Sequence, residues 1–304
     1  MLAHRGNSAE VPENTREAFE DAARMTGADV IETDTYLTKD GQFVFFHDPV
    51  LQRTTNGRGA IHKRTLAELK ELDAGYNFED NQGNHPFRGK GFKIQSVDEI
   101  LPAFKNHRFN IDIKSRDPRA PALFAKKLVD LGIEEGSESR VMVASFWQKQ
   151  IARFREASRI PTSASTMEVI EFRKVANRWA KRHRHCTANS GKITAMQCMQ
   201  RPVARQCERH CIELGRTVMQ EELFGRKLSY AALQIPEKFW ILTVIGGKWF
   251  IDFAHALGIA VHIWTINEPA DMERLLDWGV DGIFSDAPAV LIDVLDRREK
   301  KARN

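Results

Sequence analysis

Charged side chains recur at two-residue spacing along two predicted strands of this 304-residue sequence. Glu32 and Asp34 are two residues apart, as are Asp112 and Lys114, so on extended strands the members of each pair point the same way. Three carboxylates that converge from two strands are the oxygen ligands that a hard divalent cation such as Mg²⁺ or Ca²⁺ prefers. A buried ion-pair network around Lys114 is the other interpretation, and the spacing alone favours neither.

Two histidines stand where other short apolar runs end. His4 and Arg5 follow the first such run, and His47 ends a run rich in phenylalanine. A single histidine is more often structural, but two imidazoles at one site could act as general base and general acid. Arg5 and Lys114 would supply the positively charged donors that phosphoryl oxygens require. The combination therefore indicates phosphoryl chemistry.

Short apolar runs typical of strands alternate with amphipathic stretches over nearly the whole chain. Several runs are almost wholly apolar, which is typical of parallel strands covered on both faces. The predicted strands are Met1–Ala3, Val30–Asp34, Asn110–Ile113, Val141–Ala144, Pro161–Ala164, Ala231–Ile235, Ala260–Trp264 and Gly282–Phe284. The predicted helices between them are Glu13–Met25, Val97–Lys105, Ala120–Leu131, Phe146–Ala157, Lys248–Leu257 and Pro269–Gly279.

This alternation predicts an α/β protein with a (β/α)8 TIM barrel, as a single domain over residues 1–304. A doubly wound open sheet is the second choice, but no glycine-rich dinucleotide turn follows the first strand. The predicted barrel carries a small insertion at 48–94 after a short strand Phe43–His47, a long irregular excursion at 182–223 before the sixth strand, and a solvated, frayed tail at 297–304.

Charge and composition narrow the classes of partner. The 45 Lys and Arg against 41 Asp and Glu give a net charge of +4, which is small for a nucleic-acid-binding protein and suits an anionic small molecule. No apolar run reaches the roughly 18 residues of a membrane span, and no signal peptide is visible. The four cysteines lie in one short stretch, so we expect a reducing cytoplasm. The oligomeric state is left open.

An ordered set of short motifs resembles the glycerophosphodiester phosphodiesterases. The motifs run through the chain from end to end, except over Glu168–Leu223. They are His4-Arg5-Gly6, Pro12-Glu13-Asn14-Thr15, Ile31-Glu32-Thr33-Asp34, Thr38-Lys39-Asp40-Gly41, His47-Asp48, Arg53-Thr54-Thr55-Asn56-Gly57, Leu72-Asp73-Ala74-Gly75, Asp112-Ile113-Lys114, Gln234-Ile235-Pro236, Trp264-Thr265-Ile266-Asn267 and Val280-Asp281-Gly282-Ile283-Phe284-Ser285-Asp286.

The resemblance implies a barrel enzyme that uses one divalent cation, Mg²⁺ or Ca²⁺, to cleave a glycerophosphodiester into sn-glycerol 3-phosphate and an alcohol. In the mechanism usually proposed for such enzymes, a neighbouring glycerol hydroxyl attacks phosphorus, and water then opens the cyclic phosphate. A role in phosphate salvage from lipid breakdown is likewise implied by the resemblance alone.

The resemblance also implies a role for individual residues. The implied metal ligands are Glu32, Asp34 and Asp112. The implied acid and base are His4 and His47, without a choice between them, and the implied phosphate contacts are Arg5 and Lys114. Gln234 and Trp264 are weaker candidates for substrate contacts, because each has a structural alternative.

Two departures from the family pattern bear on chemistry. The third-strand ligand is usually glutamate, and Asp112 is one methylene shorter, so the backbone must move in, a water must bridge, or metal affinity falls. The first strand, Met1–Ala3, is short for a barrel and could loosen the placement of His4 and Arg5.

Three alternatives to this function deserve comparison. A lysophospholipase D or sphingomyelinase D-like enzyme would need an exposed apolar rim, for which Phe45, Phe46 and Trp264 are candidates. A non-catalytic phosphoester-binding barrel is suggested by Asp112 and the short first strand. An amidohydrolase-type barrel needs His-x-His on the first strand, and His4-Arg5-Gly6 does not supply it.

Three local features have functional and structural interpretations. A zinc knuckle in the excursion would use His183, His185, Cys186, Cys207, His210 and Cys211, but their spacing fits no regular pattern and a surface loop is favoured. Asn14 is predicted to cap the first helix, with Glu17 completing a capping box. Asp48 is expected to orient His47 or to fix the following turn.

Overall fold

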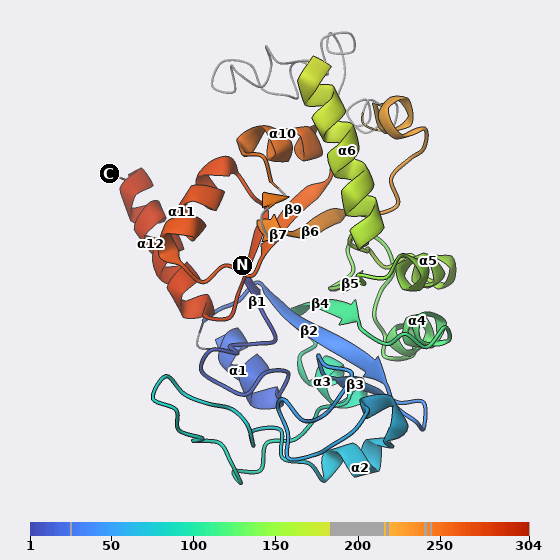
Figure 1. Ribbon diagram of the computed structural model, residues 1–304, viewed down its shortest axis with the longest axis vertical. Coiled ribbons are helices and arrows are strands. Elements are labelled where there is room, and N and C mark those ends of the chain that lie inside the picture. Colours follow the sequence, from blue (N-terminus) through green and yellow to red (C-terminus); the bar gives the residue numbers. More distant parts are fainter. Residues whose placement is uncertain (25, 183–215, 217–218, 240–241, 244, 304) are drawn as a thin grey trace.

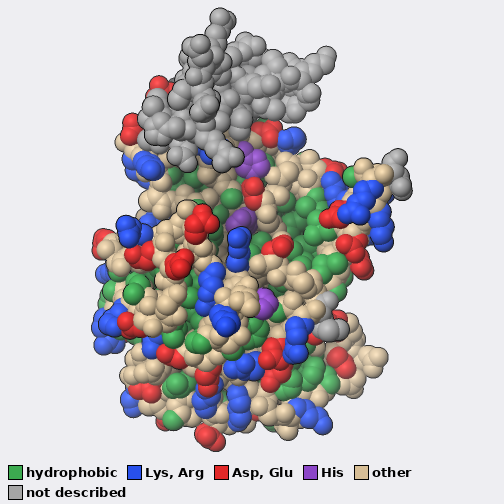
Figure 2. All heavy atoms as spheres, turned by 180° about the vertical axis from the view of Figure 1, so that it is seen from behind, with side chains coloured by type: hydrophobic (Ala, Val, Ile, Leu, Met, Phe, Trp, Pro, Cys, Tyr) green, Lys and Arg blue, Asp and Glu red, His purple; other side chains and the backbone are tan. Residues whose placement is uncertain are grey.

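The computed structural model describes residues 1–304 apart from 25, 183–215, 217–218, 240–241, 244 and 304. Parallel strands lie at the centre of the described part and helices lie outside them (Figure 1). Side chains of both charge signs are interspersed over the face in Figure 2, in keeping with the small net charge.

The parallel strands pair in the order β5–β4–β2–β1–β10–β9–β6. Their bounds are β1 (Leu2–Ala3), β2 (Val30–Leu37), β4 (Arg108–Ile113), β5 (Val141–Ala144), β6 (Ala232–Pro236), β9 (Ala260–Trp264) and β10 (Gly282–Ser285). Two isolated parallel bridges, Val143 to Thr162 and Ser163 to Ala232, join the ends of this order through the predicted fifth strand. The ring confirms the predicted TIM barrel.

A helix follows each strand position of the ring. The helices are α1 (Arg16–Arg24), α3 (Val97–Ala103), α4 (Ala120–Asp130), α5 (Gln148–Ala157), α6 (Thr166–Arg182), α10 (Lys248–Ala256), α11 (Pro269–Trp278) and α12 (Pro288–Arg303). The six helices expected from the sequence are present, and α6 and α12 are additional to them.

Most of the predicted charged tail at 297–304 lies in α12, which runs through Arg303. Arg298 anchors it, with its guanidinium 2.7 Å from both Glu273 and Asp277.

The segment that follows β2 packs around an apolar cluster on one side of the barrel. In this segment β3 (Phe43–Phe45) pairs antiparallel with β2, and η1 (Ile61–Lys63) and α2 (Leu66–Lys70) follow within the predicted insertion at 48–94. Phe46, Leu51 and Ile61 are buried in its apolar cluster. Burial of Phe46 in this cluster holds the next residue, His47, at the barrel mouth.

Close packing inside the barrel explains a glycine at the start of β10. A Cβ atom on Gly282 would lie 2.6 Å from Leu2 Cδ1 and 2.9 Å from His262 Cδ2, distances that side-chain atoms do not tolerate. The short β1 is held on both edges, since Leu2 and Ala3 pair with β10 and with β2.

Two features remain outside the barrel. The strand β7 (Lys238–Phe239) pairs antiparallel with β8 (Leu242–Thr243) in a separate two-stranded sheet. The six candidate zinc ligands at 183–211 lie outside the described residues, and the division of the chain into domain, insertion and excursion stays a prediction. Within the described ranges, no helix combines the length and apolarity that a membrane span needs.

Candidate active site

The carboxyl ends of the barrel strands surround a cavity of about 540 Å³. All nine residues singled out in the sequence line it: His4, Arg5, Glu32, Asp34, His47, Asp112, Lys114, Gln234 and Trp264. The fold therefore brings together every predicted site residue, from five strands and the segment that follows β3.

A left-handed turn after β1 aims the first residues into the cavity. Arg5 has φ +56° and Gly6 has φ +87°, and a Cβ on Gly6 would lie 2.7 Å from the backbone of Ala18. The backbone N–H of His4 donates to Ser285 at 2.9 Å, and that of Arg5 donates to Glu32 Oε2 at 3.0 Å. These bonds hold the backbone of His4 and Arg5 in place although β1 is short, so the two residues are not loosely placed as the short strand suggests.

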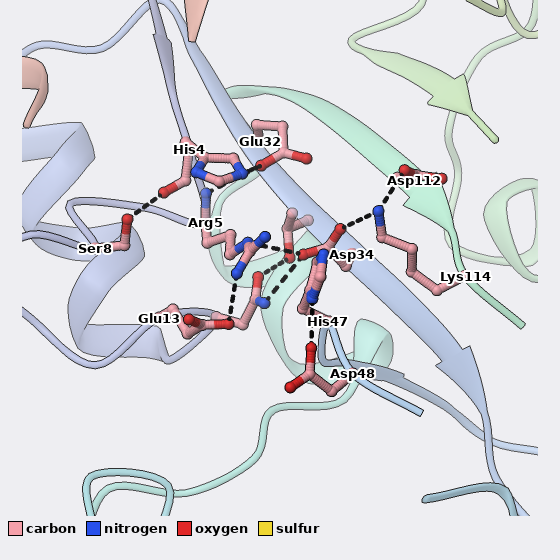
Figure 3. A network of polar contacts seen from close by, with 12 residues as sticks. His4, Arg5, Ser8, Glu13, Glu32, Asp34, His47, Asp48, Asp112 and Lys114 are labelled. Atoms are coloured by element: carbon pink, nitrogen blue, oxygen red, sulfur yellow. Dashed lines mark hydrogen bonds and ion pairs between the residues drawn. The ribbon is translucent and has the colours of Figure 1, made fainter. Parts of the chain in front are cut away.

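Each candidate catalytic histidine has a carboxylate on its Nδ1 atom. Figure 3 shows the His47–Asp48 pair and, at the other histidine, the contact of His4 with Glu32. His4 Nδ1 lies 2.5 Å from Asp286 Oδ1, and His47 Nδ1 lies 2.6 Å from Asp48 Oδ1. Such pairing fixes the ring orientation and turns Nε2 toward the opposite side, where His4 Nε2 lies 3.9 Å from Glu32 Oε2. Asp48 therefore orients His47, which was one of its two expected roles.

Asp286 is a site residue that the sequence analysis did not assign. It follows β10, accepts a hydrogen bond from Asn267 Nδ2 at 2.8 Å, and lies 282 residues from His4 in the chain. Burial lowers the pKa of His4, but the Asp286 hydrogen bond and the charge of Glu32 outweigh it and raise that pKa. The Ser285-Asp286 motif was the available signal.

Glu32, Asp34 and Asp112 form a buried acidic cluster with two internal cations. Each of the three residues is at most 5% exposed, and Asp34 lies opposite Asp112 in the β2–β4 register. Lys114 Nζ is 2.7 Å from Asp112 Oδ2 and 3.1 Å from Asp34 Oδ1. Arg5 Nε is 3.4 Å from Asp34 Oδ2. The ion-pair network that the sequence left as an alternative is therefore present.

The pKa values of the carboxyl groups diverge within this cluster. Burial, helped by the charge of Asp34, raises the pKa of Glu32 to about 7. Burial by itself would raise the pKa of Asp34 too, but the positive charges of Lys114 and Arg5 outweigh burial and lower that pKa to about 2. The pKa of Asp112 is raised by burial, against the effect of Lys114. The cluster thus holds more negative charge than its solvation favours.

The oxygen atoms of these three carboxylates are of the kind that a divalent cation binds. Among the described side chains no trio of His, Cys, Asp or Glu has metal-binding geometry, and the Lys114 ammonium lies between two of the three candidate carboxylates. Asp112 Oδ1 is buried without a hydrogen-bond partner within the described part of the chain. An unpartnered carboxylate oxygen in an all-oxygen cluster is what a hard cation would coordinate, so the residues fit Mg²⁺ or Ca²⁺.

Asn14 belongs to the site and does not cap α1, which corrects the prediction. Its Nδ2 donates to Asp34 Oδ2 at 3.3 Å and its Oδ1 accepts from Thr33 Oγ1 at 2.7 Å. Thr15 takes the capping position, since Thr15 Oγ1 accepts from the backbone N–H of Ala18 at 3.2 Å. The hydrogen bonds to Thr33 and Asp34 hold the Asn14 side chain against the buried strand β2.

The weaker candidates occupy two different places. Gln234 Nε2 donates to Asn110 Oδ1 at 2.7 Å within the barrel interior, which is its structural alternative. Trp264 lies at the mouth with its ring 5.6 Å from that of Phe146. Phe45 and Phe46 are at most 5% exposed, so they form no apolar rim.

The sequence is similar to a known family over nearly its whole length. The profile of the glycerophosphoryl diester phosphodiesterase family matches residues 4–290. The chain is 37% identical over 293 residues to a glycerophosphodiester phosphodiesterase of Bacillus altitudinis, covering 95% of this chain and 94% of that protein. It is 30% identical over 297 residues to one of Caldanaerobacter subterraneus subsp. tengcongensis, covering 97% of both.

Solved structures share the fold. A phosphodiesterase of Oleispira antarctica, solved with its product sn-glycerol-3-phosphate, has a TM-score of 0.66 at 23% identity and covers 97% of this chain and 96% of its own. A glycerophosphodiester phosphodiesterase of Agrobacterium tumefaciens has a TM-score of 0.62 at 20% identity, with 96% and 98% covered.

Proposed function

The chain belongs to the glycerophosphoryl diester phosphodiesterase family and is a phosphoric diester hydrolase, and we propose that it releases sn-glycerol 3-phosphate from glycerophosphodiesters by histidine acid/base catalysis with one divalent cation. The observation that carries this mechanism is the pair of cavity histidines, each with a carboxylate on Nδ1. This arrangement is suited to moving protons at the two Nε2 atoms.

The substrate phosphate lies between Arg5 and Lys114 in this proposal. Both cations line the cavity, and both are held by Asp34, which keeps their side chains in place before substrate arrives. Preorganised positive charge stabilises the negative charge that grows on phosphoryl oxygens in the transition state.

Proton transfer falls to His4 and His47. One imidazole takes the proton of the attacking glycerol hydroxyl, and the other protonates the leaving alcohol oxygen. The roles exchange when water opens the cyclic phosphate. Asp286 and Asp48 hold the rings and stabilise the imidazolium form at each stage.

Glu32, Asp34 and Asp112 are the proposed ligands of Mg²⁺ or Ca²⁺. Bound there, the cation would supply charge neutralisation next to the phosphate and would acidify a coordinated hydroxyl. The clustering of the cysteines supports a reducing cytoplasm as the proposed location.

Release of sn-glycerol 3-phosphate from glycerophosphocholine tests the proposal. EDTA-stripped protein should be inactive and should recover with Mg²⁺ or Ca²⁺. His4→Ala and His47→Ala should each lower kcat about 10²- to 10⁴-fold.

The matched control is His255→Ala. His255 also pairs with an aspartate, Asp281 at 2.7 Å, but does not line the cavity, so this variant should keep its activity. Retained activity in either cavity variant would refute the acid/base assignment. Phosphate-ester binding without turnover in the metal-loaded wild type would favour the non-catalytic alternative.

A further inference from the structure

The two halves of the cavity differ in chemistry. The half formed by β1, β2, β4 and the segment after β3 carries the histidines, the carboxylates, Arg5 and Lys114. The half formed by the end of β5, the start of α6 and the ends of β6 and β9 is mostly apolar. Its apolar side chains include Phe146, Val169, Ile170, Pro236 and Trp264, which we call the apolar wall.

The apolar wall reaches the surface. Phe146 is 43% exposed and Ile170 is 40% exposed, and Phe146 packs edge-to-face on Trp264 at 5.6 Å between ring centres. Large apolar side chains that remain exposed and contiguous mark a surface that gains by being covered. Here that surface is continuous with the reaction cavity, so a part of the substrate can cover it.

We propose that the apolar wall is the leaving-group subsite, and that it favours glycerophosphodiesters whose alcohol is an uncharged hydrocarbon alcohol. The inference rests on the proposed hydrolysis and adds the class of alcohol to it.

The in-line geometry of displacement at phosphorus places the leaving alcohol on the apolar wall. The free hydroxyls of the glycerol unit need hydrogen-bond partners, which the charged half of the cavity offers. The attacking and leaving oxygens lie roughly in line through phosphorus. With phosphorus near Arg5 and Lys114 and glycerol on the charged side, the leaving oxygen points to the opposite, apolar half.

Lys114 occupies the ring face of the apolar wall that a cationic alcohol would use. Lys114 Nζ lies 4.6 Å from the centre of the Phe146 ring, and so occupies a face that a quaternary ammonium would otherwise use. With that face occupied, a quaternary ammonium finds no ring contact there, whereas a hydrocarbon chain packs on the apolar side chains without needing one.

The first experiment measures kcat/KM for glycerophosphoalkanols from ethyl to hexyl in the metal-loaded full chain. These alcohols are closely similar in acidity, so the intrinsic chemistry stays the same and chain length reports burial. We expect kcat/KM to rise about two- to fourfold per methylene, and the hexyl ester to exceed glycerophosphocholine.

Matched variants locate the effect. Phe146→Ser should flatten the dependence on chain length, and Trp147→Ser should keep it, because both residues are 43% exposed but only Phe146 lines the cavity. Ile170→Ser should also flatten it. Leu123→Ser should not, since Leu123 is 41% exposed on α4 and away from the cavity.

The outcomes separate the two proposals. Turnover of all esters at one kcat/KM would overturn the subsite and leave the hydrolase function standing. No turnover of any ester by folded, metal-loaded protein would refute the proposed function itself. A gain seen only when the alkyl chain is attached to the glycerol unit would place the apolar wall on the other side of the phosphate and overturn the inference.

Discussion

The Arg53 guanidinium donates to both carboxylate oxygens of Glu13, from Nη1 to Oε2 and from Nη2 to Oε1, each at 2.7 Å. Its Nε donates to Asp48 Oδ2 at 2.5 Å, and Asp48 in turn holds His47. Glu13 also accepts from Arg5 Nη1 at 3.1 Å. One side chain of the insertion therefore ties the loop after β1 to the carboxylate that orients His47.

Arg53→Gln is expected to lower kcat about tenfold or more while KM changes little. The substitution removes the fixed three-donor fork, so Asp48 no longer holds His47 at the correct angle. Arg53→Lys should rescue only part of the loss, because an ammonium cannot span both carboxylates with the same geometry. Steady-state kinetics on glycerophosphocholine provides both constants.

Arg119→Gln is the control for this prediction. Arg119 also donates to a carboxylate, that of Asp117 at 2.7 Å, but does not line the cavity. Full activity of Arg53→Gln, or an equal loss in Arg119→Gln, would remove Arg53 from the positioning of His47.

Asp286→Asn is expected to lower the pKa of His4 and to reduce kcat. Asp286 raises the pKa of His4 through its hydrogen bond and its charge, so removing that charge lets burial lower the pKa. Loss of an orienting carboxylate costs about 10²- to 10⁴-fold in comparable sites. NMR titration of the His4 ring checks the direction, and Asp281→Asn, next to His255, is the control that should leave His4 unchanged.

Glu168→Gln is expected to lower the free energy of unfolding by about 3 kcal/mol. Glu168 is buried and accepts from Arg155 Nη1 at 2.7 Å, and Arg155 also donates to Thr162 Oγ1 at 2.8 Å and to the Ser163 carbonyl at 2.9 Å. Arg155 thus fastens the short segment through which the barrel closes. Removing the Glu168 charge leaves a mostly buried guanidinium without its counterion.

Urea unfolding measures this change. Glu171→Gln breaks an exposed pair with Arg226 and should change the free energy of unfolding by less than about 1 kcal/mol. Equal effects of the two substitutions would show that the Arg155–Glu168 pair contributes no more than an exposed one.

Stability should fall as pH is lowered from 7 to 4, in part because of His262. Burial lowers the pKa of His262 to about 4 from its ordinary 6.5. Between these values the unfolded chain binds a proton that the folded chain does not, so acid favours unfolding by up to about 3 kcal/mol from this group. His262→Asn should reduce the slope, and the exposed His62→Asn should not. Unfolding in urea at several pH values tests the difference.

Much of the barrel could be predicted from the sequence because its signals are local. Buried parallel strands need continuous apolar runs, and β5 and β9 fall where those runs do. The two-residue spacing of Glu32 and Asp34 fixes their common direction in any extended strand. Strand ends meet at one mouth in a barrel, so the histidines, carboxylates and cations of the site followed from the fold and the motifs.

Sequence by itself could not show which distant side chains pair, because spacing reports direction within one element and not the approach of two. Only the folded chain sets Asp286 beside His4 and Arg53 beside Glu13. It also turns Asn14 away from its capping position toward Asp34 and buries the phenylalanines expected at a rim. The apolar wall opposite the charged residues exists because the barrel closes, since closure brings β5, α6 and β9 to face β1 and β2.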